Sequence, residues 1–311
     1  MTLTELRYIV AVARHGNFGR AAQACFVSQP TLSVAVRKLE DELELTLFER
    51  RKSAVSLTPA GKAIVEQAER VLAEAQTLKQ LAAGEHDQLH GVLRVGLIHT
   101  VGPYILPELV PELTERAPDM PLVVEEDMTA NLRRRLDAGG LDVIVIALPF
   151  DEPGVLTRAL YDEPFVVLLP AAHAWTQRET IAVGELSQEN LLLLGPGHCF
   201  RDQVLSVCPE CINDNPSGQP SALSLENSSL ETIRHMVVSG LGITVAPCTA
   251  AGAERYARRL LAVRRFSPPE PKRTVAMAWR KTFTRPQALE CFAGAVLTCA
   301  LAGVVKHALP H

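Results

Sequence analysis

The stretch that decides the fold is NFGRAAQACFVSQPTLS, which occupies residues 17–33. Its first helix is predicted to begin after Asn17, because asparagine is a residue type that often caps helices. Ala21 and Ala22 are small enough for a second helix to cross closely. The apolar pair at 26–27 then makes a short turn. The stretch therefore predicts a helix-turn-helix.

The second helix of this motif is predicted to have two different faces. Ser28 is suited to capping its start, and Pro30 lies in the first turn, where a missing amide donor costs little. A buried stripe is formed at helical spacing by Leu32, Val36, Leu39 and Leu43. Short polar groups and an arginine on the opposite face suit the bases and phosphates of a major groove. The DNA contacts that we expect come from Ser28, Gln29, Pro30, Thr31, Ser33, Arg37, Arg50 and Arg51.

A basic run at residues 50–52 precedes a strand-like segment at 54–57. This order indicates a wing that reaches the DNA backbone. The whole chain has a net charge of −4, so any DNA-binding surface must concentrate its basic side chains locally. The spacing alone also allows an ordinary helical hairpin followed by a solvated basic loop.

Residues 59–88 are predicted to form one long helix, with Pro59 near its start and Gly84 near its end. Its apolar residues follow a heptad pattern at Ile64, Ala68, Val71, Ala75, Leu78 and Ala82. We interpret the helix as a coiled-coil linker between two copies of the chain, because no other helix in residues 1–58 is long enough to cover it. The alternative is a helix that packs on its own domain.

Residues 89–311 alternate apolar runs with helical patterns, which predicts an α/β domain. The candidate strands are Val92–Ile98, Leu122–Glu125, Asp142–Ala147, Pro164–Leu169, Leu191–Leu194, Ile243–Ala246 and Arg273–Trp279. A helix is expected over Ser228–Ser239, with Ser228 or Ser229 as its cap. Such domains bind their ligands at the carboxyl ends of their strands.

The composition places the chain among globular proteins of two or three domains, because 311 residues with 47% hydrophobic and 21% charged side chains exclude a disordered chain. The N-terminus shows no signal-peptide pattern, and the apolar stretch at 292–305 is too short to span a bilayer. We therefore expect a cytoplasmic protein. Thiols in the cytoplasm are normally reduced, so the seven cysteines are not a structural disulfide framework.

Three cysteines gather in the polar, Gly- and Pro-flanked segment 195–211, which contains Cys199, Cys208 and Cys211. His198 and Arg201 adjoin Cys199, and a neighbouring cation favours the thiolate, the form that attacks peroxide. A redox switch is one interpretation. A metal site built from His198 and the three thiols is another, and the chemistry alone leaves both open. Buried structural thiols are expected at Cys25, Cys248, Cys291 and Cys299.

The first 60 residues resemble the winged helix-turn-helix of LysR-type transcription regulators. The resemblance is carried by Phe18, Ala21, Ala22, the run Val27–Ser33, Leu39, Glu40, Leu43, the run Leu47–Arg50 and the run Leu57–Gly61. Glu44 departs from the pattern, because the family usually has Gly there; a non-Gly residue must accept left-handed geometry or extend the helix. The resemblance implies a DNA-binding regulator that forms homodimers or homotetramers.

The resemblance also implies a fold. It is an N-terminal α winged helix-turn-helix at 1–58, a linker helix at 59–88, and a C-terminal α/β regulatory domain at 89–311. The regulatory domain would have two subdomains that resemble periplasmic binding proteins. We place subdomain I at 89–162 and 267–303, and subdomain II at 163–266.

Within that family, the chain is similar to the peroxide-sensing members. The similarity is carried by the runs Thr100–Tyr104, Tyr161–Pro164, Gly197–Gln203 and Ser229–Arg234, and by Cys208 nine positions after Cys199. It implies that peroxide oxidises Cys199 to sulfenic acid and that Cys208 then forms a disulfide with it. Cys211 stays open as an alternative resolving thiol. The pocket residues that we expect are Thr100, Thr129, His198, Arg201 and Asp202.

Formation of this disulfide is expected to change the spacing of the helix-turn-helix domains (the DNA-reading heads) in the oligomer, to recruit RNA polymerase and to activate oxidative-stress genes. We expect no cofactor and no enzymatic activity. Two alternatives stay open. One is a LysR-type regulator that binds a small organic effector, and the other is a Cys/His metal sensor.

Overall fold

The protein was analysed as a computed structural model, which describes residues 1–50, 55–83, 88–212, 229–252 and 260–308. The chain forms two compact units. The first comprises residues 1–87 and 134–141, and the second comprises residues 88–133 and 142–311. Each unit is described by itself below.

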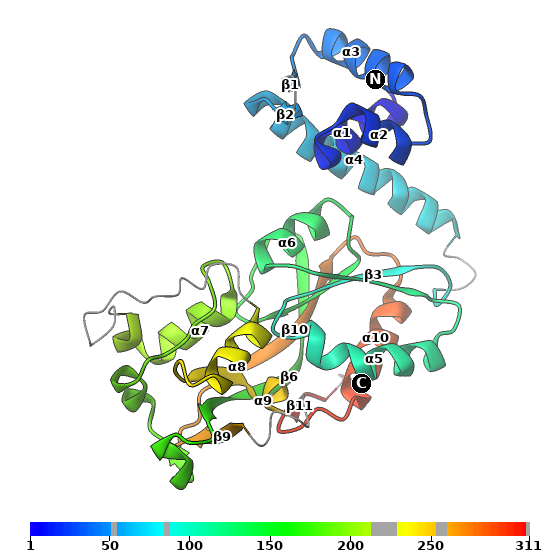
Figure 1. Ribbon diagram of the computed structural model, residues 1–311. Helices are drawn as coiled ribbons and strands as arrows, with labels where there is room; N and C mark the ends of the chain where they lie inside the picture. The colour runs from blue at the N-terminus through cyan, green and yellow to red at the C-terminus, as the bar shows by residue number, and fades with distance from the viewer. Residues whose placement is uncertain (51–54, 84–87, 213–228, 253–259, 309–311) are drawn as a thin grey trace. The chain divides into compact units, whose positions relative to one another are not determined.

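The first unit begins with a winged helix-turn-helix and continues into one long helix, as expected (Figure 1). Its elements are α1 (Leu3–His15), α2 (Phe18–Ala24), α3 (Gln29–Leu43), β1 (Phe48–Arg50), β2 (Val55–Leu57) and α4 (Pro59–Ala83). Strands β1 and β2 pair antiparallel and form the wing. Side chains of α1, α2 and α3 share one apolar core with the wing and with the start of α4.

The local signals in the helix-turn-helix act as the sequence predicts. The Asn17 side chain accepts a hydrogen bond from the Arg20 amide at 3.0 Å, and the Ser28 hydroxyl accepts one from the Thr31 amide at 3.2 Å. Leu32, Val36 and Leu39 are fully buried, whereas Leu43 is only half-buried. Glu44 ends α3 with φ = 53°, so it accepts the left-handed geometry that usually requires glycine.

Helix α4 packs on its own unit along its first turns. Val65 and Ala68 are buried against the helix-turn-helix core, and α1 is the helix that covers them. The expectation that no helix of this region covers the seam is therefore wrong for its first half. Farther along, Leu78 is 69% exposed in the single chain. An apolar side chain exposed in this way is available to pack against a second copy in a coiled coil. Pairing of α4 in a coiled coil stays a prediction.

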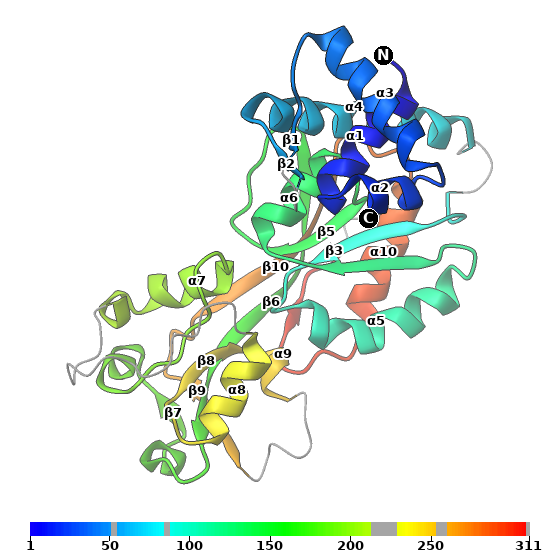
Figure 2. The same ribbon diagram turned by 45° about the horizontal axis from the view of Figure 1, so that its top comes forward.

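The second unit is built on a mixed sheet with helices beside it (Figures 1 and 2). Its strands are β3 (Leu93–Leu97), β4 (Leu122–Glu126), β5 (Val143–Ala147), β6 (Val155–Pro170), β7 (Thr180–Ile181), β8 (Thr244–Pro247), β9 (Leu261–Phe266), β10 (Lys272–Arg280) and β11 (Val305–Lys306). Its α-helices are α5 (Gly102–Arg116), α6 (Thr129–Asp137, whose last residues are counted with the first unit), α7 (Cys199–Val207), α8 (Leu230–Val238), α9 (Cys248–Ala251) and α10 (Pro286–Thr298). Short 3₁₀ helices are η1 (Ala174–Gln177), η2 (Val183–Gln188) and η3 (Pro209–Ile212).

Strand β6 belongs to both halves of this sheet, which runs in the order β4-β3-β5-β10-β6-β9-β7 (Figure 2). Its first part pairs with β10, and its last residues pair with β8 and β9. Strands β3, β4 and β5 are parallel, so their carboxyl ends meet at one edge. Loops at that edge carry the site described below.

Several sequence predictions for this unit need correction. Leu191–Leu194 is not a strand, because only Leu191 pairs, in an isolated bridge with Ile243. The run is apolar because Leu192 and Leu194 are buried, and a residue can be buried without pairing to a neighbouring strand. The predicted strand at 164–169 is only the second half of β6, whose first half has a mixed pattern of polar and apolar residues.

The remaining predicted strands are present, and none of their ends is shifted by more than one residue. Helix α8 begins after the cap Ser229, while Ser228 lies outside the described residues. The apolar stretch near the C-terminus packs inside the unit, with Phe292 and Val296 of α10 fully buried. In the part of the chain that the structure describes, no helix combines the length and the apolar character that a membrane span requires.

Candidate functional site

A small pocket lies where three loops meet, just before the helices α5, α6 and α7. One loop follows β3, one follows β4, and the third leads into α7. The pocket is lined by Ile98, His99, Thr100, Asp127, Met128, Thr129, Gly197, His198, Cys199 and Phe200. Its cavity measures about 10 Å³, close to the space that one water-sized molecule needs. The pocket is therefore suited to a molecule of a few atoms.

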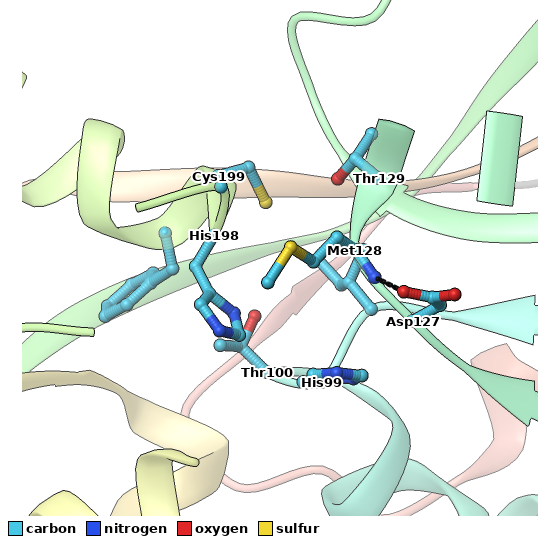
Figure 3. Close-up of a pocket in the computed structure, with 10 residues that line it drawn as sticks. His99, Thr100, Asp127, Met128, Thr129, His198 and Cys199 are labelled. Atoms are coloured by element: carbon cyan, nitrogen blue, oxygen red, sulfur yellow. Dashed lines mark hydrogen bonds between the residues drawn. The ribbon is translucent and has the colours of Figure 1, made fainter. Parts of the chain in front are cut away.

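The pocket has a thiol on one side and imidazoles on the other (Figure 3). The Cys199 sulfur and the Thr129 hydroxyl face each other, and His198, Thr100 and His99 lie beyond the Met128 thioether. Cys199 is the first residue of α7, and His198 is its N-cap. Backbone amides at a helix start favour negative charge nearby.

Thr100 is held in place by a buried arginine. The Arg273 guanidinium donates to the Thr100 hydroxyl at 2.8 Å and to the Thr100 carbonyl at 2.9 Å. Its charge is balanced by Glu163 at 2.8 Å, and both side chains are almost completely buried. Because the Thr100 oxygen already accepts from Arg273, its own O–H proton can donate to a molecule in the pocket.

Two buried polar atoms at the pocket have no hydrogen-bond partner in the described structure. They are the Thr129 hydroxyl oxygen and the Nδ1 atom of His99. A buried polar atom without a partner costs free energy, about 1–3 kcal/mol for a neutral group. A small hydrogen-bonding molecule in the pocket would satisfy these atoms.

His198 is a neutral imidazole around neutral pH. Burial lowers its pKa, and the neighbouring His99 lowers the pKa further. The two rings lie 5.5 Å apart between their centroids. A neutral imidazole can accept or donate a proton, which suits a step in which peroxide oxygen leaves as water.

Gly197 lies beside Met128 in a backbone conformation that favours glycine. Its φ is +94°, and a Cβ atom there would lie 2.8 Å from the Met128 sulfur. A larger residue would therefore strain the loop before Cys199 and displace the Met128 side chain.

Helix α7 is anchored in the core by Phe200 and Val204, each 2% exposed. The Phe200 ring packs edge-on against Phe165 at 5.1 Å between centroids, and the Arg273 guanidinium lies over it at 5.2 Å. The packing of Phe200 therefore fixes the position of the neighbouring Cys199.

Two residues expected in the pocket do not line it. Arg201 donates to the Leu194 carbonyl at 2.9 Å, and the side chain of Asp202 is exposed in the first turn of α7. Arg201 lies two positions after Cys199, and helix positions two apart do not face each other. Asp202 is absent from the residues that line the pocket. Of the expected pocket residues, the structure brings together Thr100, Thr129 and His198 with Cys199.

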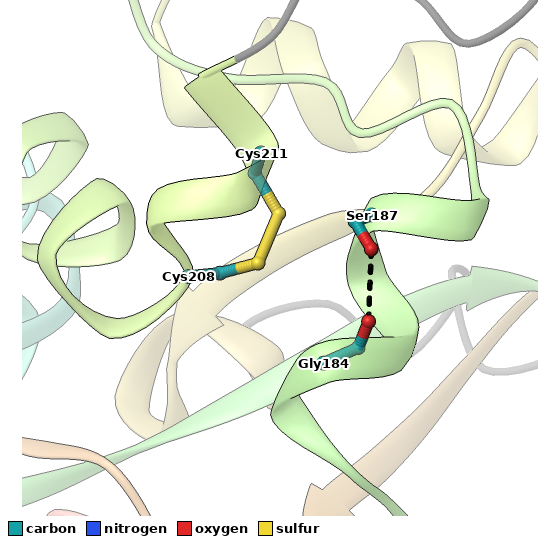
Figure 4. The surroundings of a disulfide bond; sticks show 4 residues. All are labelled: Gly184, Ser187, Cys208 and Cys211. Carbon is teal, nitrogen blue, oxygen red and sulfur yellow. Dashed lines mark hydrogen bonds between the residues drawn. A yellow bond between two sulfur atoms is a disulfide. The ribbon is translucent and has the colours of Figure 1, made fainter.

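The disulfide in the described structure joins Cys208 to Cys211 (Figure 4). The resemblance implied a bond between Cys199 and Cys208, whereas Cys199 is a free thiol here. The reason is geometric, because α7 separates Cys199 from Cys208, its C-cap residue. The four ligands of the metal hypothesis are not brought together for the same reason, and no cluster of three or more His, Cys, Asp or Glu side chains suits a metal among the described residues.

Of the four other thiols that were expected to be buried, Cys299 is buried, whereas Cys25, Cys248 and Cys291 are half-buried. Burial raises the pKa of Cys248 to about 12 and that of Cys299 to about 11. It also raises the pKa of Cys25 and of Cys291. These thiols stay protonated at neutral pH and are poor nucleophiles.

The residues expected to contact DNA gather around the start of α3. Ser28, Gln29, Pro30, Thr31 and Arg37 are exposed, and Ser33 is half-buried. Arg50 ends β1 in the wing, while Arg51 lies outside the described residues. The exposed N-terminal turn of α3 has the form that enters a major groove in helix-turn-helix proteins.

Sequence analysis missed His99, Asp127, Met128 and Arg273. The first three follow predicted strands directly, so the rule that sites lie at the carboxyl ends of strands was the available signal. Asp127 accepts hydrogen bonds from the Met128 amide and the Asn131 side chain, each at 2.7 Å, and so fixes that loop. No local sequence pattern pointed to Arg273, because it reaches the site from a strand that is distant in the sequence.

Comparison with known proteins gives consistent results. Residues 3–62 match the family of bacterial regulatory helix-turn-helix proteins of the LysR type, and residues 86–299 match the LysR substrate binding domain. The hydrogen peroxide-inducible genes activator of Dickeya chrysanthemi is 40% identical over 90% of each chain. A full-length OxyR variant from Pseudomonas aeruginosa is 52% identical, with a TM-score of 0.80 over 100% of this chain and 99% of that one. A mutant OxyR from Corynebacterium glutamicum, described as H2O2-bound, is 35% identical, with a TM-score of 0.63 over 95% and 91%.

Proposed function

The chain belongs to the LysR family of bacterial transcription regulators, and from this membership we propose that it is a DNA-binding activator switched by hydrogen peroxide at Cys199. The family consists of regulators that bind DNA rather than of enzymes. The Dickeya chrysanthemi relative is named as an activator of hydrogen peroxide-inducible genes, and the two structural relatives are OxyR proteins. Its switch, its pocket and its DNA contacts are proposed residue by residue below.

The observation that carries the proposal is the pocket around Cys199. It combines a free thiol at a helix start with hydrogen-bonding groups in a cavity of about 10 Å³. Hydrogen peroxide has two oxygens and two protons, so it can donate to one pocket atom and accept from another. Thr100 can donate, and the unpartnered Thr129 oxygen can accept.

The proposed chemistry begins with attack of the Cys199 thiolate on the nearer peroxide oxygen. The O–O bond breaks, Cys199 becomes sulfenic acid, and the departing hydroxide takes a proton and leaves as water. Thr100 and His198 stabilise the departing oxygen by hydrogen bonds. The Cys208 thiol, when reduced, then attacks the sulfenic sulfur, and a second water leaves as the disulfide forms.

The disulfide acts as a switch because α7 must open to allow it. The two cysteines lie nine positions apart along α7, about 13 Å at the rise of an α-helix, whereas a disulfide requires Cα atoms within about 7 Å. Opening α7 removes Phe200 and Val204 from the core. We propose that this rearrangement changes how two copies of the regulatory domain pack, and thereby the spacing of the DNA-reading heads.

Several finer parts of the proposal rest on family membership. The DNA contacts are proposed at Ser28, Gln29, Pro30, Thr31, Ser33, Arg37, Arg50 and Arg51. The working form is proposed to be a homotetramer, or at least a homodimer through α4, in which the exposed Leu78 would be covered. The regulator would act in the cytoplasm and recruit RNA polymerase. The domain limits stay those given under Sequence analysis.

The competing function is regulation by a small organic effector. The described pocket disfavours it at this place, because even a small carboxylic acid needs several times the volume of a water molecule. An effector regulator would respond without Cys199, whereas the peroxide switch would not.

The experiment is an anaerobic titration of the reduced full-length chain with hydrogen peroxide. Sulfenic acid is trapped with dimedone in Cys208→Ser/Cys211→Ser, which lacks both candidate resolving thiols, and mRNA is measured in peroxide-treated cells that carry the wild type or Cys199→Ser. We expect dimedone on Cys199 after about one equivalent and no gene induction with Cys199→Ser. Cys291→Ser is the control and should respond as the wild type does. Induction that survives Cys199→Ser would overturn the proposal.

A further inference from the structure

Cys208 has two possible disulfide partners, and they require different states of α7. In the described structure Cys208 is bonded to Cys211, with their Cα atoms 5.6 Å apart, while α7 is intact and Cys199 lines the pocket. A bond from Cys208 to Cys199 would require α7 to open. Cys208 cannot hold both bonds at once, so each bond excludes the other.

The Cys208–Cys211 pair is built into one turn. The Cys211 amide donates to the Cys208 carbonyl at 3.1 Å, and η3 begins with Pro209, directly after Cys208. Cys208 is 3% exposed, whereas Cys211 is half-buried at the edge of the same core (Figure 4). The two sulfurs are therefore brought together by the turn itself.

We propose that Cys211 ends the peroxide signal by taking Cys208 away from Cys199. This inference rests on the proposed function, because it starts from the Cys199–Cys208 disulfide. The Cys211 thiolate attacks the Cys208 sulfur, the Cys199–Cys208 bond breaks, and Cys199 leaves as a thiolate. The sequence CPEC at 208–211 is thus a second redox-active site, and its product is the disulfide seen in the structure.

The atoms and electrons balance without a further oxidant. Peroxide gives sulfenic acid and one water, the first disulfide releases a second water, and the exchange only moves the bond. In sum, one hydrogen peroxide and the two thiols of Cys208 and Cys211 give their disulfide and two waters. Cys199 returns to its starting oxidation state.

The exchange runs toward Cys211 because the structure of α7 is recovered. With Cys199 released, Phe200 and Val204 return to the core, and Cys199 returns to the pocket. The Cys208–Cys211 disulfide does not require α7 to open, since the bond and the intact helix are both present in the structure. The local turn also keeps the attacking thiol beside its target.

The transfer of the disulfide from Cys199–Cys208 to Cys208–Cys211 is called the relay. It gives the regulator a refractory state, in which it cannot respond to further peroxide. While Cys208 is bonded to Cys211, a second peroxide can oxidise Cys199, but no thiol is available to form the switching disulfide. A dithiol reductant must first open the Cys208–Cys211 bond, and the more exposed Cys211 sulfur is the accessible point of attack. The response therefore reports a pulse of peroxide rather than its continued presence.

The test is a time course on the fully reduced, full-length chain. One equivalent of hydrogen peroxide is added without oxygen, samples are quenched with acid and N-ethylmaleimide, and disulfides are mapped by mass spectrometry. In the wild type we expect Cys199–Cys208 first, then Cys208–Cys211 with Cys199 alkylated. In Cys211→Ser the Cys199–Cys208 bond should last at least about tenfold longer. Cys291→Ser should follow the wild-type course.

Two outcomes would overturn the relay alone. One is a stable Cys199–Cys208 bond in the wild type with Cys211 alkylated. The other is formation of Cys208–Cys211 at the same rate in Cys199→Ser, which would show direct oxidation. In both cases dimedone would still label Cys199 in the double variant Cys208→Ser/Cys211→Ser, which has neither candidate resolving thiol. Absence of that label would instead overturn the proposed function together with the relay.

Discussion

Cys199 and Cys208 lie at the two ends of one helix, the first as residue one of α7 and the second as its C-cap. Between them, Phe200 and Val204 bury their side chains in the core. Opening the helix exposes both, at a cost of about 1.5–3 kcal/mol for each side chain. The bond between these two cysteines must therefore be formed against the packing of α7, which is why the proposed oxidation changes the shape of the protein.

Replacement of Thr100 by Val should slow the oxidation of Cys199. Val has nearly the same shape but removes the hydroxyl that accepts from Arg273 and can donate into the pocket. We expect the rate constant for loss of the Cys199 thiol with peroxide to fall roughly 10- to 100-fold. Thr114→Val, on the exposed side of α5, is the matched control. A Thr100→Val rate within twofold of the wild type would show that the hydroxyl plays no part.

Gly197→Ala should disturb the pocket by straining its backbone and by displacing the Met128 side chain. The new methyl group would lie 2.8 Å from the Met128 sulfur, on a backbone with φ = +94°. We expect a loss of about 1–3 kcal/mol in the free energy of unfolding, together with slower oxidation of Cys199. Shortening Met128 to Ala in the same chain should recover part of this loss.

Gly240 offers the comparison, because its φ is +76° and a Cβ there meets open space. Gly240→Ala carries the backbone strain without the contact, so it should lose about 1 kcal/mol in urea unfolding. An equal loss for both alanine variants would assign the effect of Gly197→Ala to the backbone alone and not to the contact with Met128.

His198 should make the stability of the protein fall in mild acid. Its pKa in the folded chain lies below the ordinary 6.5, first because of burial and then because of His99. The unfolded chain therefore binds a proton more readily, so the free energy of unfolding falls as the pH drops below about 6.5 and levels off below the folded pKa. His198→Asn should lose this dependence when urea unfolding is compared at pH 7.5 and 5.5. The exposed His235→Asn should keep it. An unchanged pH dependence in His198→Asn would remove His198 as its source.

Glu44→Gly should stabilise the helix-turn-helix. Glu44 holds φ = 53° at the end of α3, a geometry that glycine adopts without a steric penalty. The expected gain is about 0.5–1 kcal/mol in the free energy of unfolding. Asp41→Gly, inside the same helix, should instead cost roughly 0.3 kcal/mol, because aspartate is itself a poor helix former. Destabilisation by both changes would contradict the account of this cap.

The sequence predicted what depends on neighbours along the chain. Asn17 and Ser28 cap their helices through bonds to amides three residues later, so their role depends only on the local sequence. The spacing of Leu32, Val36 and Leu39 likewise defines a buried face. Cys199 could be singled out from its neighbours His198 and Arg201. The cysteines allowed two interpretations, a redox switch or a metal site. Only the resemblance to a known family favoured the redox switch.

Contacts between distant segments could not be predicted in the same way. Arg273 reaches Thr100 from 173 positions away, and no local pattern reports that contact. The apolar run at Leu191–Leu194 showed burial correctly but not backbone pairing, so a strand was predicted where there is none. The bond from Cys208 to Cys211 depends on the turn that η3 makes after α7.

The central claim is that a Cys199–Cys208 bond opens α7, and amide hydrogen exchange of α7 tests it most directly. The measurement uses full-length Cys211→Ser, in which the proposed relay cannot remove the bond, before and after one equivalent of hydrogen peroxide without oxygen. Peptides covering residues 199–207 should be protected in the reduced protein and should lose that protection once the disulfide has formed. Protection that stays unchanged while mass spectrometry shows the Cys199–Cys208 disulfide would contradict the account.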